Sequence, residues 1–269
     1  MRSGAGMVAG MAGAGFQESP VLPRICIAPA RAMYVGPGLR LAPHQVVATT
    51  LAVSLGEPFA LRTWRRSTGW SAWQPRQVAA IPSETFHHLQ SEGPMAFLYL
   101  DPLTDRRELP DAQRLAHGRQ LLRAAGPAFS LATAFAAFGL LPRVPRDGRI
   151  ARVVQAVEQQ PQAFGRLREA ADLACLSPSR FRARFDAEVG LPFRRYRMWR
   201  RMALVMRALA QGSDLTTAAL ACGFASSAHL SAAFKQMFGL SAREVLALGV
   251  AIDTSEDRVP VDRPPASAR

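Results

Sequence analysis

Apolar positions in the first hundred residues fall into short runs that glycine and proline separate. These runs predict strands at Ala32–Val35, Gln45–Ser54, Phe59–Thr63, Gln77–Ile81 and Met95–Leu100. Several positions in the second run are β-branched, which suits a pleated, half-buried surface. Turn signals at residues 36–38, 56–58, 82–83 and 93–94 separate the runs. Strands at this spacing, with no helices between them, predict a small all-β sandwich or barrel.

The pattern changes to a helical period after residue 102. Helices are expected at Asp111–Ala125 and Phe129–Leu140, followed by a proline-rich break at residues 141–148. From Arg149 to about Gly249 the chain has a helical pattern throughout. The predicted fold class is therefore α+β multidomain, with an all-β first half, a helical linker and an all-α second half. Residues 1–20 and 250–269 have the composition of disordered tails.

The helical half contains an internal repeat, with copies at residues 167–190 and 215–239. In each copy a short apolar helix leads through a tight turn to a second helix that begins at a serine cap. At an offset of 49 residues, Ser177, Phe181 and Phe185 correspond by role to Ser226, Leu230 and Phe234. This is the helix-turn-helix arrangement, which presents its second helix to the major groove of DNA.

The stretch Phe193–Gln211 joins the two copies. It carries six arginines and no acid, and its apolar residues recur every three or four positions, as in an amphipathic helix. An ordinary surface helix with solvated arginines would show the same pattern. As a helix it would span roughly 28 Å, close to the ~34 Å between successive major grooves on one side of DNA. We interpret it as a strut between two DNA-reading units.

Charge and cysteine content narrow the function classes. The formal net charge of +13 and the pI near 11.3 favour an anionic partner. Residues 149–249 hold 15 basic and 7 acidic residues, and residues 21–148 hold 14 and 8, so charge alone does not locate the DNA-binding part. The three cysteines are unclustered, which argues against a disulfide scaffold or a cysteine-based zinc site.

Specific motifs in residues 149–245 resemble the AraC/XylS family of bacterial transcription regulators. The resemblance rests on Ser-x-Ser-Arg-Phe-x-x-x-Phe at 177–185, Gly-Leu-Pro-Phe at 190–193, the string from Ala221 to Lys235, and Phe-Gly-Leu-Ser at 238–241. It implies two helix-turn-helix units bridged by one long helix. More weakly, residues 24–102 resemble the family's cupin-like sensor domain, through residues 34–38, 43–44, 81–82, 87–88 and 98–102. That resemblance implies a double-stranded β jelly roll.

In the first unit, the exposed face of the reading helix is expected to hold Ser179, Arg180, Arg182, Ala183 and Arg184. By resemblance, Ser179, Arg182 and Ala183 face base edges. Arg182 is then the candidate for a bidentate guanine contact, worth about 1–3 kcal/mol of discrimination. The simpler alternative is that Arg182 is a solvated surface side chain. Arg180 and Arg184 are expected to contact phosphates.

The corresponding face of the second unit lacks arginine, glutamine and asparagine. It holds Ser227, Ala228, Ser231 and Ala232, with His229 and Lys235 as candidate phosphate contacts. We therefore expect the first unit to carry more sequence information. In the joining helix, two or three arginines are expected to contact phosphates, and the candidates are Arg194, Arg197, Arg200 and Arg201. The remaining arginines would be solvated or paired with acids such as Asp186 and Glu188.

The competing class is a cupin metalloenzyme with a DNA-binding appendage. Metal-binding cupins need clustered histidines and a carboxylate, and this chain offers only His44, His87 and His88 as candidate ligands. No nucleophile triad, Walker loop or dinucleotide fingerprint is present in the sequence. We therefore expect a regulator without catalysis and without a cofactor.

The predicted domains are a sensor at 21–102, a helical linker or dimerisation region at 103–148 and a DNA-binding domain at 149–249. The uncharged stretch Ala124–Pro142 is long enough to cross a bilayer, but it is alanine-rich and broken by glycine and proline, so a buried or dimer-forming helix is favoured. Expected partners are double-stranded DNA, an unidentified small-molecule effector, a second copy of the chain and RNA polymerase. The expected location is the bacterial cytoplasm, at the nucleoid, as an activator of transcription.

Overall fold

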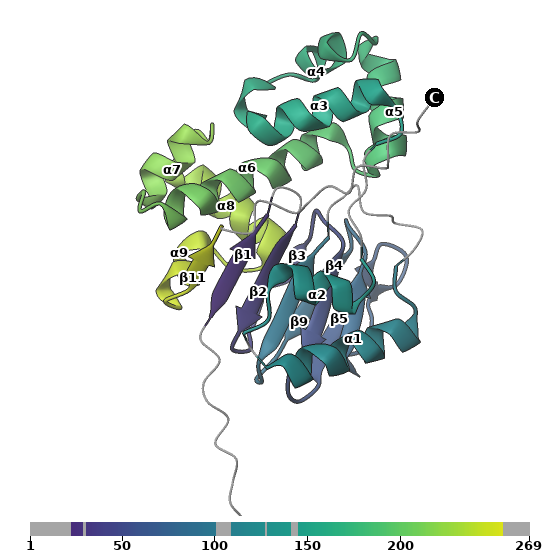
Figure 1. The fold of residues 1–269 in the computed structure, drawn as a ribbon, viewed down its shortest axis with the longest axis vertical. Coiled ribbons are helices and arrows are strands. Elements are labelled where there is room, and N and C mark those ends of the chain that lie inside the picture. Colours follow the sequence, from purple (N-terminus) through teal and green to yellow (C-terminus); the bar gives the residue numbers. More distant parts are fainter. Residues whose placement is uncertain (1–22, 29–30, 101–108, 127, 141–144, 255–269) are drawn as a thin grey trace, which may run out of the picture.

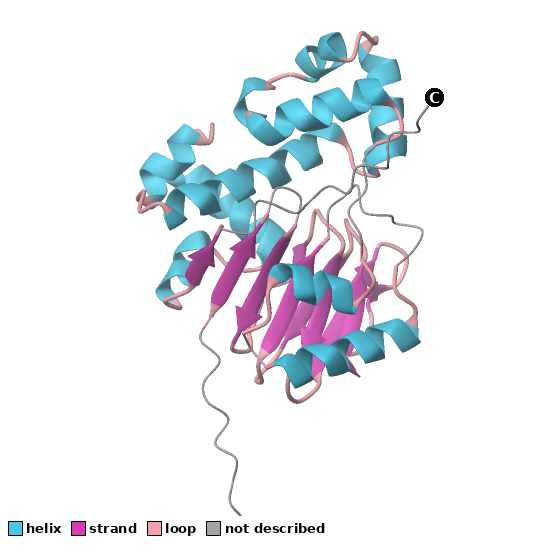
Figure 2. Ribbon diagram, in the orientation of Figure 1, coloured by secondary structure: helices cyan, strands magenta, loops and turns pink. Residues whose placement is uncertain are grey.

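The chain divides into a β-rich half and a helical half (Figure 1), with the strands gathered in the lower part of the view and most of the helices above them (Figure 2). The computed structural model describes residues 23–28, 31–100, 109–126, 128–140 and 145–254. The tail expected at residues 1–20 lies outside these residues. None of the helices in the described part of the chain is both long enough and apolar enough to cross a bilayer.

The β-rich half is built from strands connected by short turns. They are β1 (Arg24–Ile27), β2 (Ala32–Gly36), β3 (His44–Gln45), β4 (Thr50–Ser54), β5 (Phe59–Arg65), β6 (Gly69–Trp70), β7 (Gln74–Arg76), β8 (Val78–Ile81), β9 (Phe86–Gln90) and β10 (Met95–Tyr99). Within the described residues, one sheet has the order β11-β1-β2-β10-β4-β8 and a second has the order β3-β9-β5-β6, with β7 also paired to β5. All pairings except that of β1 with β11 are antiparallel.

The strands of the first sheet are apolar on both faces because both faces are covered. In β10, Met95 and Phe97 face a core between the two sheets, while Ala96 and Leu98 face the helices that cover the other side of the first sheet. Those helices are α1 (Ala112–Ala125) and α2 (Leu131–Ala137), which lie in front of the sheet in Figure 1. They pack closely, since a Cβ atom on Gly118 of α1 would lie 2.4 Å from the Phe138 ring.

The helical half follows in the order that the pattern predicts. It contains α3 (Gly148–Gln159), a 3₁₀ turn at Pro161–Ala163, α4 (Leu167–Leu173), α5 (Pro178–Val189), α6 (Phe193–Ala210), α7 (Leu215–Ala221), α8 (Ser227–Phe238) and α9 (Ala242–Ala247). The first unit, α4 and α5, closes an aromatic core with α3 and the start of α6, in which Phe193 contacts Phe181 and Phe185. This core contains, among the described residues, only positions from 150 to 196.

The second unit, α7 and α8, shares its core with the β-rich half. Ile27, Val47 and Ala48 are buried in the same cluster as Val205, Leu230 and Phe234. Tyr99 of β10 stacks against Trp199 of α6 and Phe238 of α8, with ring centroids 5.8 and 5.4 Å apart. The second unit is therefore fixed to the β-rich half by apolar packing, whereas the first has a core of its own.

Several details differ from the sequence-based expectation. The single strand expected at Gln45–Ser54 is two strands, β3 and β4, which belong to different sheets. β1, β6, β7 and β9 were not expected at all, although the alternating burial of β9 is clear in the structure. Beyond Gly249, where we expected a disordered tail, residues Ala251–Asp253 form β11 and pair with β1. The rest of that expected tail, residues 255–269, lies outside the described residues.

Candidate nucleic-acid interface

The two expected reading helices, α5 and α8, have matching ends. The side chains of Ser177 and Ser226 cap them by accepting hydrogen bonds from the third helical residue. Each helix ends at a glycine in the left-handed conformation, Gly190 and Gly239, with φ of 76° and 79°. The offset of 49 residues holds at both ends, so the repeat seen in the sequence is a repeat of backbone structure.

The first reading helix exposes a cationic face. Phe181, Phe185 and Val189 are buried, and the five side chains predicted to face DNA are all exposed, namely Ser179, Arg180, Arg182, Ala183 and Arg184. The separation follows from the helical period, since the buried positions recur every four residues. A cationic ridge on a helix whose opposite face is fixed by aromatic packing is suited to enter a groove lined by phosphates.

A hollow beside this helix brings three arginines together. It has a volume of about 480 Å³ and is lined by Arg182 of α5 and by Arg194 and Arg197 of α6. Burial and, secondarily, repulsion from the nearby charge of Arg194 lower the pKa of Arg197. An anion placed in the hollow would relieve that repulsion, which is how a DNA phosphate would be held.

Two other arginines of α6 are placed differently from our expectation. Arg200 is buried and lies 3.4 Å from the carboxylate of Glu158 on α3. Arg201 is also buried; its Nε donates to the carbonyl oxygen of Cys222, and its guanidinium lies 4.0 Å from the centroid of the Phe224 ring. Both guanidinium groups have partners inside the protein, so we assign the two arginines a structural role in place of the expected phosphate contacts. Arg200 links α6 to α3, and Arg201 links α6 to the turn of the second unit.

The second reading helix exposes a less charged face. Ala228, His229, Ala232 and Lys235 are exposed, and Ser227 and Ser231 are half-buried. His229 is partly engaged at the turn, where its Nδ1 accepts from the backbone N–H of Ala225 and its ring packs edge-on against Phe224. Gln236 is exposed too, and it is a polar side chain of α8 that was not among the residues predicted to face DNA.

The β-rich half contacts the end of α8 and the start of α6. The backbone N–H of Ala42 donates to the carbonyl oxygen of Gly239 at 2.9 Å. Arg195 of α6 donates to the Oε1 atom of Gln45 at 3.3 Å, and it lies 3.8 Å from the carboxylate of Glu84. Arg195 therefore faces the β-rich half, unlike its neighbour Arg194, which is exposed.

The histidines proposed as metal ligands form a pair without a third ligand. The rings of His44 and His87 are stacked 4.3 Å apart, and each Nδ1 donates to a backbone carbonyl oxygen, that of Ala42 and Thr85 respectively. Burial and the neighbouring ring lower the pKa of His44 from 6.5 to about 3. His88 points to the other face of β9, towards Arg62. In the part of the chain that the structure describes, no group of three or more metal-ligating side chains occurs.

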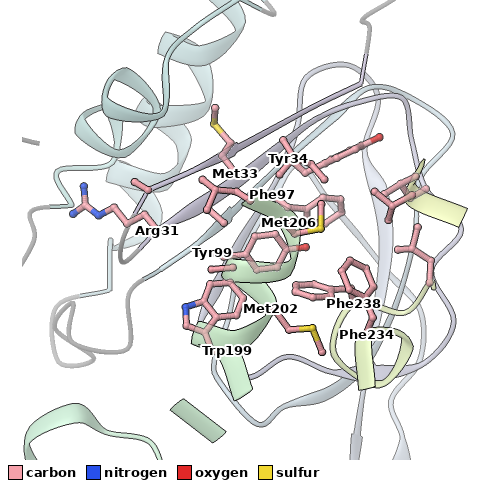
Figure 3. A pocket seen from close by; sticks show the side chains of 18 of the residues that line it. Arg31, Met33, Tyr34, Phe97, Tyr99, Trp199, Met202, Met206, Phe234 and Phe238 are labelled. Atoms are coloured by element: carbon pink, nitrogen blue, oxygen red, sulfur yellow. The ribbon is translucent and has the colours of Figure 1, made fainter. Parts of the chain in front are cut away.

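An apolar cavity of about 80 Å³ lies between the two halves. Figure 3 shows Tyr99, Trp199, Met202, Met206, Phe234 and Phe238 gathered around it, from strands on one side and helices on the other. Tyr34 lines it as well, and burial raises the pKa of Tyr34 to about 12. Trp64, Trp70 and Trp73 do not line it, because they lie on β5, β6 and the following loop.

Comparisons with known proteins agree with this architecture. Residues 170–247 match a protein-family model described as a helix-turn-helix domain. No curated protein sequence matches the chain. An apo variant of ToxT from Vibrio cholerae strain SCE256 superposes with a TM-score of 0.52 at 10% identity, over 81% of this chain and 97% of that chain. ToxT of strain O395 gives 0.49 at 11% identity, over 80% and 93%. Identity this low supports a shared fold and nothing further.

Proposed function

We propose that the protein is a sequence-specific transcription regulator of the AraC type with an N-terminal sensor domain, and that residues 170–247, which match the helix-turn-helix family model, are its DNA-binding domain. The observation that carries the proposal is the pair of matched reading helices on one continuous strut. α6 has 18 residues, about 27 Å of helix, so α5 and α8 can approach successive major grooves, which lie ~34 Å apart.

The reading roles are unequal in this proposal. Arg182 contacts guanine from α5, with Ser179 and Ala183 on neighbouring base edges. Arg194 and Arg197 of α6 line the same hollow as Arg182 of α5. They would therefore hold the phosphates next to the guanine that Arg182 contacts. The short side chains of α8 suit close approach to the groove, with Ala228 and Ala232 against thymine methyl groups, and they add little discrimination.

The test is selection of binding sites from a randomised pool of duplexes by the full chain, repeated over a range of salt concentrations. We expect a bipartite motif with one strongly and one weakly specified half, about one helical turn apart. Affinity should fall steeply with salt, because several arginines displace counterions from the phosphates. Absence of binding to any duplex at low salt would exclude the proposal.

The cavity between the halves favours an apolar effector. Its lining is mostly apolar and includes aromatic and thioether side chains, and both halves contribute to it, so a compound held there would contact the β-rich half and the helical half at once. Met202 and Met206 can move to enlarge it. We propose that a small apolar compound binds there and alters DNA affinity, with activation of transcription as the outcome. Met202→Trp, which fills the space, should abolish the response to such a compound in a reporter assay without removing DNA binding.

A further inference from the structure

The end of the helical half returns to the β-rich half as a strand. After α9 the chain turns at Gly249, where φ is 67°, and β11 joins the edge of the first sheet parallel to β1. The register pairs Arg24 with Ala251, Ile25 with Ile252 and Cys26 with Asp253. The N–H of Ala251 also donates to the carbonyl oxygen of Pro23 at 3.0 Å. Figure 1 shows β11 alongside β1, next to α9.

This short strand is attached to both halves at once. Its backbone covers the β1 edge, which would otherwise present unpaired N–H and C=O groups. On its other side, Ile252 and the preceding Val250 pack against the core that the second unit shares with the β-rich half, and α6 lies close to β11. Because only three residues pair, the strand can open without unfolding either half.

The attached state also brings negative charge to the DNA-binding surface. Glu84, on the turn before β9, lies 3.8 Å from Arg195 and close enough to Asp186 of α5 to act on its carboxylate. Two carboxylates at the junction of α5 and α6 oppose the approach of phosphates. Moving the β-rich half away from α6 would remove Glu84 and free Arg195 for the anionic partner.

We propose that β11 is a latch: paired with β1, it holds the second unit against the sensor in a state that binds DNA weakly, and it leaves the β1 edge when both units engage DNA. The inference rests on the proposed function, since it needs a DNA-binding chain. The apparent affinity is reduced by the fraction of molecules in which the latch is closed. Opening it permanently therefore tightens DNA binding.

Two matched pairs of variants test the latch, one pair truncated and one pair substituted in the full chain. A chain ending at Gly249 lacks β11, whereas a chain ending at Thr254 keeps it. Ile252→Asp puts a charge where the strand packs on the shared core, and Ala251→Asp puts the same charge on its exposed neighbour. With a duplex selected by the wild-type chain, the first member of each pair should bind about tenfold more tightly if about nine closed molecules in ten are released. The second member should match the wild type.

Hydrogen exchange on the wild-type chain gives a readout that needs no variant. Those amides of Arg24–Ile27 and Ala251–Asp253 that donate between β1 and β11 should be protected in the free protein and should exchange faster when the duplex is added. The β1 amides that donate to β2 should not change. Unchanged protection with DNA, or equal affinity of the Gly249 and Thr254 chains, would overturn the latch and leave DNA binding intact. If no chain binds any duplex, the proposed function itself fails.

Discussion

The two helix-turn-helix units have the same backbone structure and differ in the residues that surround it. α5 and α8 have the same length, the same serine cap and the same terminal glycine. The first unit packs on itself and exposes arginines, whereas the second packs on the sensor and exposes alanine and serine. The difference shows that the same backbone motif can pack in two ways. In the function that we propose, the unit with its own core reads DNA, and the unit with the shared core passes on the state of the β-rich half.

The largest expected effect on stability distinguishes the hydrophobic core of the first unit from the core that the second unit shares. Phe185→Ala empties a fully buried site in the first unit and should cost about 3–5 kcal/mol. Because no described residue of the sensor lines that core, denaturant unfolding should show loss of the first unit while the sensor remains folded. Phe234→Ala, its counterpart, should loosen the sensor and the second unit together. Identical unfolding profiles for the two variants would contradict the division.

Base reading should be lost mainly from the first unit. Arg182→Ala should cost about 1–3 kcal/mol at the preferred sequence and leave binding to other sequences nearly unchanged. Site selection should then return a motif with one relaxed position. Ser231→Ala, the equivalent change in α8, is the control and should leave the motif as it was. An unchanged motif for Arg182→Ala would refute the role assigned to it.

A substitution that adds an arginine to α8 tests the difference between the two helices from the opposite direction. Ser231 stands at the position of Arg182 in the repeat and is half-buried at the edge of the α8 face. Ser231→Arg should create a guanine preference in the weak half of the binding site, worth at most about 1–3 kcal/mol. Selection with this variant would show a second specified position about one helical turn from the first. A preference adjacent to the existing one would mean that α5 and α8 do not occupy successive grooves.

Acid should weaken the contact that the second unit makes with the sensor. His44 packs against Gly239, and its folded-state pKa of about 3 is far below its usual 6.5. The unfolded chain therefore binds the proton first, and stability should fall as the pH drops below about 6.5, by up to about 1.4 kcal/mol per pH unit. His44→Gln should flatten this dependence, measured by denaturant unfolding from pH 7 to pH 5. A slope unaffected by the substitution would place the acid sensitivity elsewhere.

Phosphate contacts should give the smallest and least selective effect. Arg194→Ala should weaken binding to all duplexes equally and reduce the salt slope by about 1. Arg200→Ala is the contrasting change, because it removes a buried arginine and its ion pair with the half-buried carboxylate of Glu158, and it should lower stability first. Titrations at several salt concentrations, with unfolding curves beside them, would distinguish the two arginines.

The sequence predicted most of the helical half correctly, because its signals are local. Serine caps, the glycines after α5 and α8 and the four-residue spacing of Phe181 and Phe185 act within one or two helical turns. In the β-rich half the same reasoning located β2, β5, β8 and β10 and missed β1, β6, β7 and β9. In β9 the sequence Phe-His-His-Leu-Gln was considered for its histidines as ligands. The burial of His87 depends on its pairing with His44 of β3, which is distant in the sequence.

By itself, then, the sequence determined the repeat, the strut between its copies and the cationic face of α5. Only the tertiary structure decided which arginines of α6 are available. The helical period alone does not distinguish Arg194 from Arg200, and the difference comes from Glu158 on α3. It also decided that Ala251–Asp253 form a strand, because a three-residue segment has no pattern of its own and becomes a strand only where an open sheet edge accepts its hydrogen bonds.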